Sequence, residues 1–384
     1  MKKSLLALAA MSAFAGAAQA QSSVTVYGLL DAGLGSSVLK EQTATVTTVT
    51  STQGSNPGAN GSGVAGSQLG SGAMASSRLG FRGVEDLGGG LSANFNLEYA
   101  IAQGTGTTTV ANIRTSTVGI ASKTLGGLTF GRALTGMHGI LAGDVFGGSN
   151  MAGDITYTHF ISSAAGAGAT VNGRINQDTT RGSNMITYTA PVIAGLALRA
   201  DYSNNNTTTA NQPGAQNAIA GAYATFTQGP FSVKAGQVRQ QANAAIAATA
   251  VFTRTELKVN GANAMYKDKG LTIQYTVGNN MTETKTATTT VHTSSVRAQK
   301  LGLSYQVTPA IMPFVQYGIG GSEGVRTGAN LTTNDKAMQA GAIYTLSKRT
   351  NLYAAYGDSQ RELKSNSALK TKQTEYAVGL LHAF

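Results

Sequence analysis

Arginine and carboxylate side chains are the groups with which this sequence could do chemistry, because its other reactive groups are few and scattered. The four histidines, His138, His159, His292 and His382, occur singly, and cysteine is absent. Neither HExxH nor CxxC spacing is present, so no metal or cofactor site is predicted. A Ser/His/Asp site would form in space rather than in sequence, but nothing here points to one. We therefore expect a protein that is not an enzyme and needs no cofactor.

Two arginines stand at inward positions of the clearest predicted hairpin. The pattern indicates strands over residues 76–85 and 91–102, joined by a glycine-rich turn. In the second arm large apolar residues alternate with Ser, Asn and Glu. The same alternation in the first arm sends the apolar side chains to one face and Arg78 and Arg82 to the other. A charge facing lipid would cost about 2–4 kcal/mol, so both arginines are predicted to face water.

The predicted first and last strands alternate in the same way. Residues 23–34 place Val and Leu on one face and Asp31 on the other, so Asp31 is predicted to face a lumen. Residues 375–384 present one mostly large, apolar face that ends on Phe384. Such a strand is explained if it pairs with the first one, because a membrane barrel leaves no open edge. We expect these two segments to close a ring.

The remainder of the chain repeats a unit of strand, tight turn, strand and long polar loop. Counting gives sixteen strand candidates in eight pairs, or roughly 23 residues for each strand with its connection. That length suits membrane strands of about 9–11 residues with short turns on one side and long loops on the other. No window approaches 18 unbroken apolar residues, so no transmembrane helix is expected. The sequence predicts an all-β, sixteen-stranded antiparallel transmembrane β-barrel.

The start of the chain and its charge indicate where the protein works. Residues 1–20 have the charged start, apolar run and small-residue cleavage site of a signal peptide, which leaves residues 21–384 as the barrel domain. The chain has 28 Lys and Arg against 17 Asp and Glu, and loss of Lys2 and Lys3 leaves a net charge of about +9. Export favours anionic solutes or an anionic lipid surface over nucleic acid as the partner of this charge.

One loop departs from the repeating layout. Residues 134–178 include Ile140, Leu141, Val145 and Phe146, which are too apolar for a loop that stands in water. Such a segment should pack against another surface. In a wide barrel that surface is the inner wall, so this third loop is predicted to fold inward.

Five short segments in this order resemble the general diffusion porins of Gram-negative outer membranes, of the proteobacterial type. They are Val24-Thr-Val-Tyr-Gly28 with Asp31, Ser77 to Leu91, Thr129-Phe-Gly-Arg132, Phe146-Gly-Gly148 and Gly379-Leu-Leu-His-Ala-Phe384. Each motif is weakly specific alone, but together they span the mature chain. The resemblance implies a sixteen-stranded barrel in the cell outer membrane, a homotrimer, and a third loop folded inward to narrow the pore.

The resemblance also implies a basic ladder at the narrow point, formed by Arg78, Arg132 and Arg181. Strict alternation from Leu128 and Phe130 would send Arg132 outward, so its inward position requires the strand to end or bulge there. The third loop of the family often carries acids opposite the ladder. Here that stretch holds only Asp144, which is therefore placed with Asp31 and Arg82 in the predicted constriction.

These residues predict a water-filled channel for passive diffusion of small hydrophilic solutes and ions. Taken singly, each arginine is explained as a solvated or paired lumen residue, but as a set they would concentrate anions in a narrow neck. The predicted surroundings are outer-membrane lipid and lipopolysaccharide. Two alternatives stay open: a substrate-specific porin, which would need an aromatic slide or a denser basic track, and an adhesin-type surface barrel that uses its Thr-rich loops.

Overall fold

The structure, a computed structural model, describes most of the chain after the predicted signal peptide. The described residues are 23–42, 52–54, 68–71, 74–101, 113–142, 145–146, 181–206, 216–246, 251–285, 290–326, 329–364 and 366–384. Residues 1–20, Asp144, His159 and most of the third loop lie outside them. The signal peptide and the boundary at residue 21 therefore stay predictions.

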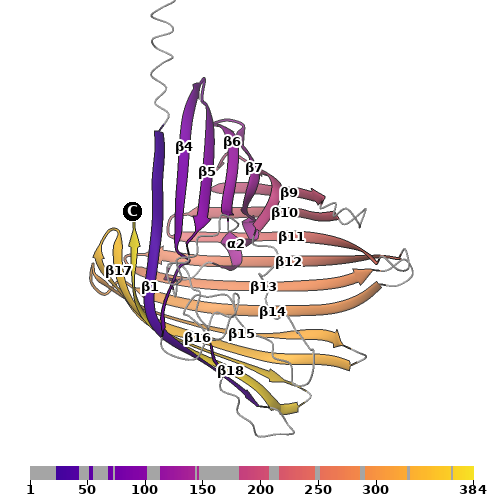
Figure 1. The fold of residues 1–384 in the computed structure, drawn as a ribbon. Coiled ribbons are helices and arrows are strands. Elements are labelled where there is room, and N and C mark those ends of the chain that lie inside the picture. The colour runs from indigo at the N-terminus through magenta and orange to yellow at the C-terminus, as the bar shows by residue number, and fades with distance from the viewer. Residues whose placement is uncertain are drawn as a thin grey trace, which may run out of the picture.

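The described residues form one antiparallel sheet that closes on itself as a barrel (Figure 1). Its sixteen long strands are β1 (Ser23–Gln42), β4 (Arg78–Gly88), β5 (Leu91–Ala100), β6 (Ile113–Ser122), β7 (Gly126–Leu134), β8 (Arg181–Thr189), β9 (Leu196–Asn206), β10 (Gln216–Gln228), β11 (Phe231–Ile246), β12 (Val251–Asp268), β13 (Leu271–Lys285), β14 (Thr290–Tyr305), β15 (Ile311–Arg326), β16 (Ala329–Ser347), β17 (Thr350–Leu363) and β18 (Asn366–Ala383). Two short strands, β2 (Thr52–Gly54) and β3 (Gln68–Ser71), pair with β1. The predicted sixteen-stranded barrel is confirmed.

The ring closes where it was expected to close. The first half of β1 pairs with β4, and its second half pairs with β18 from Leu29↔Ala383 onward. At the seam the Gly28 amide donates to the Phe384 carbonyl at 3.0 Å, and the Phe384 amide donates back to Gly28 at 3.1 Å. Because β1 has a partner on both sides, the ring has no open edge there.

Alternation along the strands separates an apolar outer face from a polar inner face. On β1, Val24 and Val26 are 65% and 54% exposed to the surroundings, whereas Asp31 is fully buried on the other face. On β13, Ile273 and Tyr275 point outward, while the hydroxyl of Thr276 lies inside and accepts a hydrogen bond from the Asn263 amide at 2.7 Å. The outer face suits hydrocarbon and the inner face suits water. Within the described residues, no helix is long and apolar enough to cross a bilayer.

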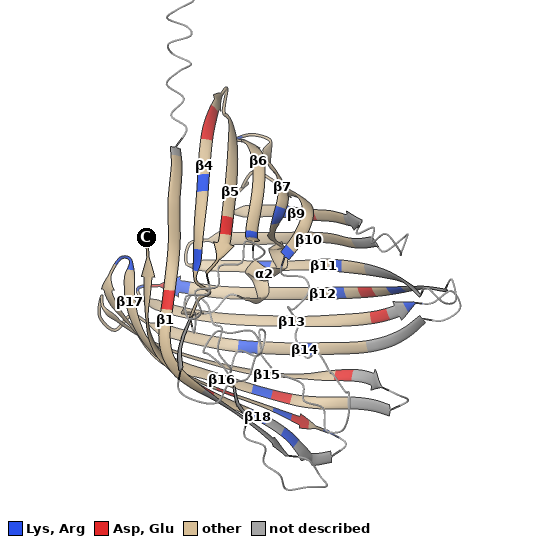
Figure 2. Ribbon diagram, viewed as in Figure 1, with Lys and Arg blue, Asp and Glu red and all other residues tan. Residues whose placement is uncertain are grey.

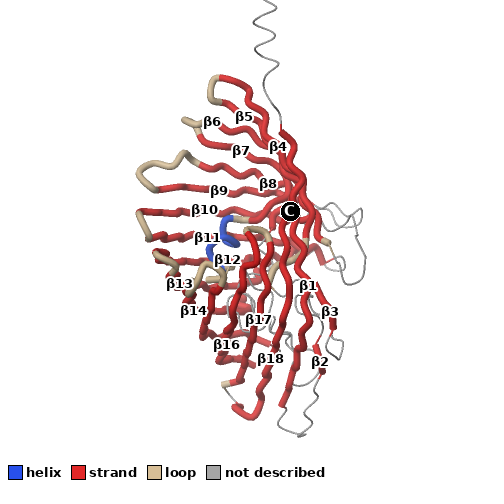
Figure 3. Tube along the Cα trace, turned by 90° about the vertical axis from the view of Figure 1, so that its left-hand side faces the viewer, coloured by secondary structure: helices blue, strands red, loops and turns tan. Residues whose placement is uncertain are grey.

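The strands from β11 to β18 are longer than the predicted 9–11 residues. The lack of an apolar period predicts loops at residues 280–295 and 321–335, but β13 and β14 extend into the first of these segments and β15 and β16 into the second. The predicted glycine-rich turn joins β4 to β5 at residues 89–90, and a similar tight turn joins β12 to β13 at residues 269–270. Figure 3 shows such turns along one end of the barrel. These extra residues are polar on both faces of the strands. They lack the apolar alternation of the rest because they extend beyond the hydrocarbon, where both faces meet water.

The described part of the third loop lies against the inner wall, which confirms its inward fold. It starts with the short helix α2 (Gly136–Leu141), whose Met137, Ile140 and Leu141 are buried against Val238 and Val259 of the wall. The helix is seen inside the ring in Figures 1 and 3. Wall glycines make room for it. A Cβ on Gly261 would stand 2.8 Å from Leu141 and 2.9 Å from the Met137 sulfur.

Further along the loop, an aromatic contact fixes the next described residues to β14 and β15, the adjoining part of the wall. The Phe146 ring stacks on Phe314 with centroids 4.0 Å apart, and the Ser304 hydroxyl donates to the Val145 carbonyl at 3.0 Å. The loop therefore follows the wall from β9 to β15.

Candidate functional site

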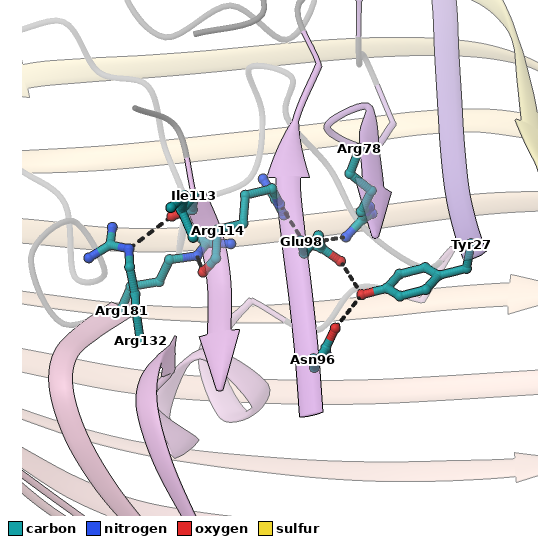
Figure 4. Close-up of polar contacts among 8 residues, drawn as sticks. All are labelled: Tyr27, Arg78, Asn96, Glu98, Ile113, Arg114, Arg132 and Arg181. Carbon is teal, nitrogen blue, oxygen red and sulfur yellow. Dashed lines mark hydrogen bonds and ion pairs between the residues drawn. The ribbon is translucent and has the colours of Figure 1, made fainter. Parts of the chain in front are cut away.

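A cluster of arginines lies on the inner wall formed by β4 to β8 (Figure 4). Glu98 of β5 is at its centre. One Glu98 oxygen is 2.7 Å from Arg114 Nε and 4.0 Å from Arg78 Nη1, and the Tyr27 hydroxyl donates to the other at 3.3 Å. Beyond this group, Arg181 Nε donates to the Arg114 carbonyl at 3.1 Å. Among the residues that the structure describes, the cluster thus holds one carboxylate and several guanidinium groups.

Arg132 joins the cluster because β7 bulges. The pairing of β7 with β8 shifts register between Gly131 and Ala133, and Gly131 has φ +126, a conformation that favours glycine. Leu128 and Phe130 point outward, yet the bulge turns the next side chain inward. Arg132 Nε donates to the Ile113 carbonyl at 2.9 Å and its Nη1 to the Ser183 hydroxyl at 2.6 Å. The predicted condition for an inward Arg132 is met.

A second bulge places Arg114, which the sequence reasoning missed. Outward Val118 and Ile120 of β6 would send Arg114 outward by alternation, but the register with β5 shifts between Glu98 and Tyr99. The side chain therefore turns to Glu98. The signal that could have found it is the same as for Arg132: an arginine at a lipid-facing position is costly, so a bulge should be expected.

Arg82 lies one step nearer the short β4–β5 turn. Its guanidinium carbon is 5.1 Å from the centre of the Tyr27 ring, a cation–π distance, and the side chain is exposed. The Tyr27 hydroxyl also donates to Asn96 at 2.8 Å. Arg82 and Arg78 therefore both face the lumen from β4, as the alternation predicted, and Tyr27 stands between Arg82 and Glu98.

Of the two acids predicted for the constriction, Asp31 and Asp144, the structure describes only Asp31. Asp31 faces inward but is buried, and it accepts hydrogen bonds from the Met74 and Ala75 amides at 2.9 and 2.7 Å and from the Tyr353 hydroxyl at 2.7 Å. It fixes the segment before β4 to the wall, so we do not place it among the residues that meet passing ions. Asp144 lies outside the described residues and stays a prediction.

Another buried acid, Asp201 of β9, fixes the start of the third loop. It accepts the Gly136 amide at 2.8 Å and the Thr187 hydroxyl at 2.8 Å, and it pairs with Arg199 at 2.8 Å. Arg199 in turn donates to the Leu134 carbonyl at 2.6 Å. Alternation alone could have found Asp201 as an inward acid, but not its partner on the loop.

The positive charge of the arginine cluster affects the pKa of His138 in α2. Burial first, and then the charges of Arg181, Arg114 and Arg78, together lower the pKa of His138 to about 4. The imidazole is therefore neutral near pH 7. The helix and the cluster thus border the same space, with the arginines on one wall and the loop against the other.

Comparison with known proteins decides the family. The model of the family described as Gram-negative porin matches residues 7–362. This chain belongs to the Gram-negative porin family. Its members are channels rather than enzymes, and this protein is accordingly an outer-membrane porin with a transmembrane β-barrel.

Individual relatives agree over the full length. Outer membrane porin protein 32 of Delftia acidovorans is 29% identical over 400 residues, with all of both chains covered. The structure is similar to the anion-selective porin from Comamonas acidovorans, with TM-score 0.66 and 24% identity over 95% of this chain and 100% of that chain. It is also similar to the trimer form of OmpT of Vibrio cholerae, with TM-score 0.60 and 16% identity over 94% and 99% of the two chains.

Proposed function

We propose that this porin passes small hydrophilic solutes and ions by passive diffusion and prefers anions. The observation that carries the proposal is the composition of the arginine cluster. Among the described residues of the cluster, Glu98 is the one carboxylate and pairs with Arg78 and Arg114. Arg132 and Arg181 are bonded to the neighbouring backbone of β6. The similarity to a porin named as anion-selective supports the same direction.

The mechanism needs electrostatics and size but no bond making. Guanidinium groups fixed along one wall of a narrow, partly desolvated passage lower the energy of an anion there and raise that of a cation. The backbone carbonyls of Ile113 and Arg114 hold two of these groups without neutralising them. The inward third loop limits the size of what passes. Solutes then move down their own gradients.

Charge removal tests this assignment. Removing one unit charge about 8 Å from an ion in a water-filled pore changes the ion's energy by roughly 0.5 kcal/mol, in opposite directions for an anion and a cation, so their permeability ratio changes about fivefold. Arg132→Gln and Arg181→Gln should each lower the anion-to-cation permeability ratio by about that factor, as measured from zero-current potentials across planar bilayers under a salt gradient.

A matched variant separates local from general effects. Arg349 is exposed in the β16–β17 turn, and Arg349→Gln removes the same charge far from the cluster. The permeability ratio of this variant should stay at the wild-type value. If all three variants shift selectivity equally, the preference comes from the whole surface charge and not from the cluster.

The surroundings of the channel are part of the proposal. We infer a homotrimer in the outer membrane, in contact with lipid and lipopolysaccharide, and the trimer form of the similar OmpT supports the oligomer. Liposome swelling with neutral sugars of increasing size tests the general channel. A smooth decline of the swelling rate with sugar size supports it, whereas rapid swelling with one sugar class would favour a substrate-specific porin.

A further inference from the structure

The short helix α2 contains two glycines, and packing explains only one of them. Gly136 lies against the Tyr223 ring, so an added Cβ there would overlap the ring. Gly139 is exposed, and its backbone is not left-handed. A Cβ on Gly139 would meet no described atom within 4 Å. Glycine inside a helix is unfavourable relative to alanine, so neither the backbone nor contacts with described residues require a glycine at position 139.

The period of the helix directs position 139 away from the wall. Met137, Ile140 and Leu141 form the buried stripe of α2 that packs on β11 and β12. With 3.6 residues per turn, position 139 lies about 150° around the helix from the middle of this stripe. Gly139 is therefore on the side of the helix that faces the interior of the barrel.

The arginine cluster borders the same interior. Leu134, the last residue of β7, pairs with Arg181 at the start of β8, and α2 begins two residues after Leu134. Burial, and then the charges of three arginines of the cluster, lower the pKa of His138, the neighbour of Gly139. In Figure 2 α2 is tan, and blue segments lie on strands beside it. The passage thus has guanidinium groups on one side and an uncharged helix face on the other.

Hydrogen bonds hold the helix in place on both sides of this glycine. The Gly136 amide, in the first turn, donates to Asp201 at 2.8 Å. Lys234 of β11 donates from Nζ to the Gly139 carbonyl at 3.3 Å, and a cation is favourable near the carbonyl end of a helix. Because the backbone at position 139 is fixed in this way, a side chain added there would project into the passage.

We propose that Gly139 sets the width of the passage opposite the arginine cluster, and with it the size limit of the solutes that pass. The proposal rests on the proposed diffusion channel and names a residue that determines its specificity by size. A glycine keeps the space in front of the helix free, so a hydrated anion or a small polar solute can pass the guanidinium groups. Any larger group at this position narrows the pore.

Thiol labelling of the whole porin in planar bilayers tests the proposal. The sequence has no cysteine, so Gly139→Cys carries one reactive group in each chain. The probes are methanethiosulfonate reagents that add a methyl, a sulfonatoethyl or a trimethylammonioethyl group. Because conductance depends on pore diameter, each of the two larger groups should lower the single-channel conductance about twofold or more relative to the same channel before labelling. The methyl group should lower it much less.

The matched control carries its thiol away from the passage. Asp268→Cys, at the exposed end of β12, should react with the same reagents and keep its conductance. Mass spectrometry verifies complete labelling of both variants. Labelling follows folding, so a loss of conductance on labelling does not come from a failure to fold. Full labelling of Gly139→Cys without loss of conductance would overturn the proposal, as would equal losses in the two variants or from all three groups.

The same recordings separate this proposal from the proposed anion preference. The two larger groups have opposite charges, so a loss with both of them reports size rather than charge. A wild-type channel that prefers cations would contradict the anion preference but would leave the loss of conductance in labelled Gly139→Cys unaffected. An anion-preferring channel that keeps its full conductance after labelling would leave the proposed function in place and remove Gly139 from the passage.

Discussion

At the scale of single residues, the anion preference that we propose depends on how little negative charge accompanies the arginines among the described residues. Glu98 is the described acid in contact with Arg114 and Arg78, at 2.7 and 4.0 Å. Glu98→Gln keeps the size of the side chain and removes the charge. The anion-to-cation permeability ratio should therefore rise about fivefold, by roughly 1 kcal/mol. Zero-current potentials measure it, and a fall in the ratio would mean that Glu98 does not screen the pore.

The titration of His138 gives a prediction on stability. Because its pKa is lowered to about 4, the unfolded chain binds this proton first as the pH falls below the ordinary value of 6.5. The folded state thus loses at most about 3 kcal/mol relative to the unfolded state between pH 6.5 and 4. His138→Gln should remove that loss. Urea unfolding midpoints of both proteins from pH 8 to 4 would check this, and parallel profiles would contradict it.

At the scale of elements, the start of the third loop is held by one buried carboxylate. Asp201→Asn removes the charge that faces Arg199 and weakens the acceptor for the Gly136 amide. Breaking a buried pair on one side costs about 3–5 kcal/mol, so we expect α2 to loosen and single-channel current noise to increase. Asp268→Asn, in an exposed turn, should leave the noise unchanged. If the current noise of Asp201→Asn equals that of wild type, the packing of Met137 and Leu141 against the wall is enough to hold α2 in place.

The strands also show which inward side chains can be predicted from the sequence. Alternation placed Arg78 and Arg82 inside, since their neighbours in β4 follow a strict period of two. Alternation alone sends Arg114 outward, and only the cost of a charge that faces lipid could have indicated the bulge that turns it inward. The long ends of β13 to β16 were predicted as loops for a related reason: where both faces of a strand meet water, its sequence has no hydrophobic period.

At the scale of the whole molecule, the barrel depends on its seam. The Phe384 ring covers Gly28, where an added Cβ would overlap it. Gly28→Ala should therefore lower the free energy of unfolding by about 1–3 kcal/mol through overpacking. Gly139→Ala, where a Cβ meets nothing within 4 Å, serves as the control and should change stability by less than about 0.5 kcal/mol. Unfolding midpoints in detergent compare the two, and equal midpoints would remove Phe384 from the closure.

The central claim is that fixed guanidinium groups on the wall from β4 to β8 make this porin favour anions. The most direct measurement is the zero-current potential of the wild-type channel in a planar bilayer under a tenfold potassium chloride gradient. The account predicts a potential with the sign of chloride permeation, positive on the concentrated side relative to the dilute side. A potential of the opposite sign, set by potassium, would contradict it.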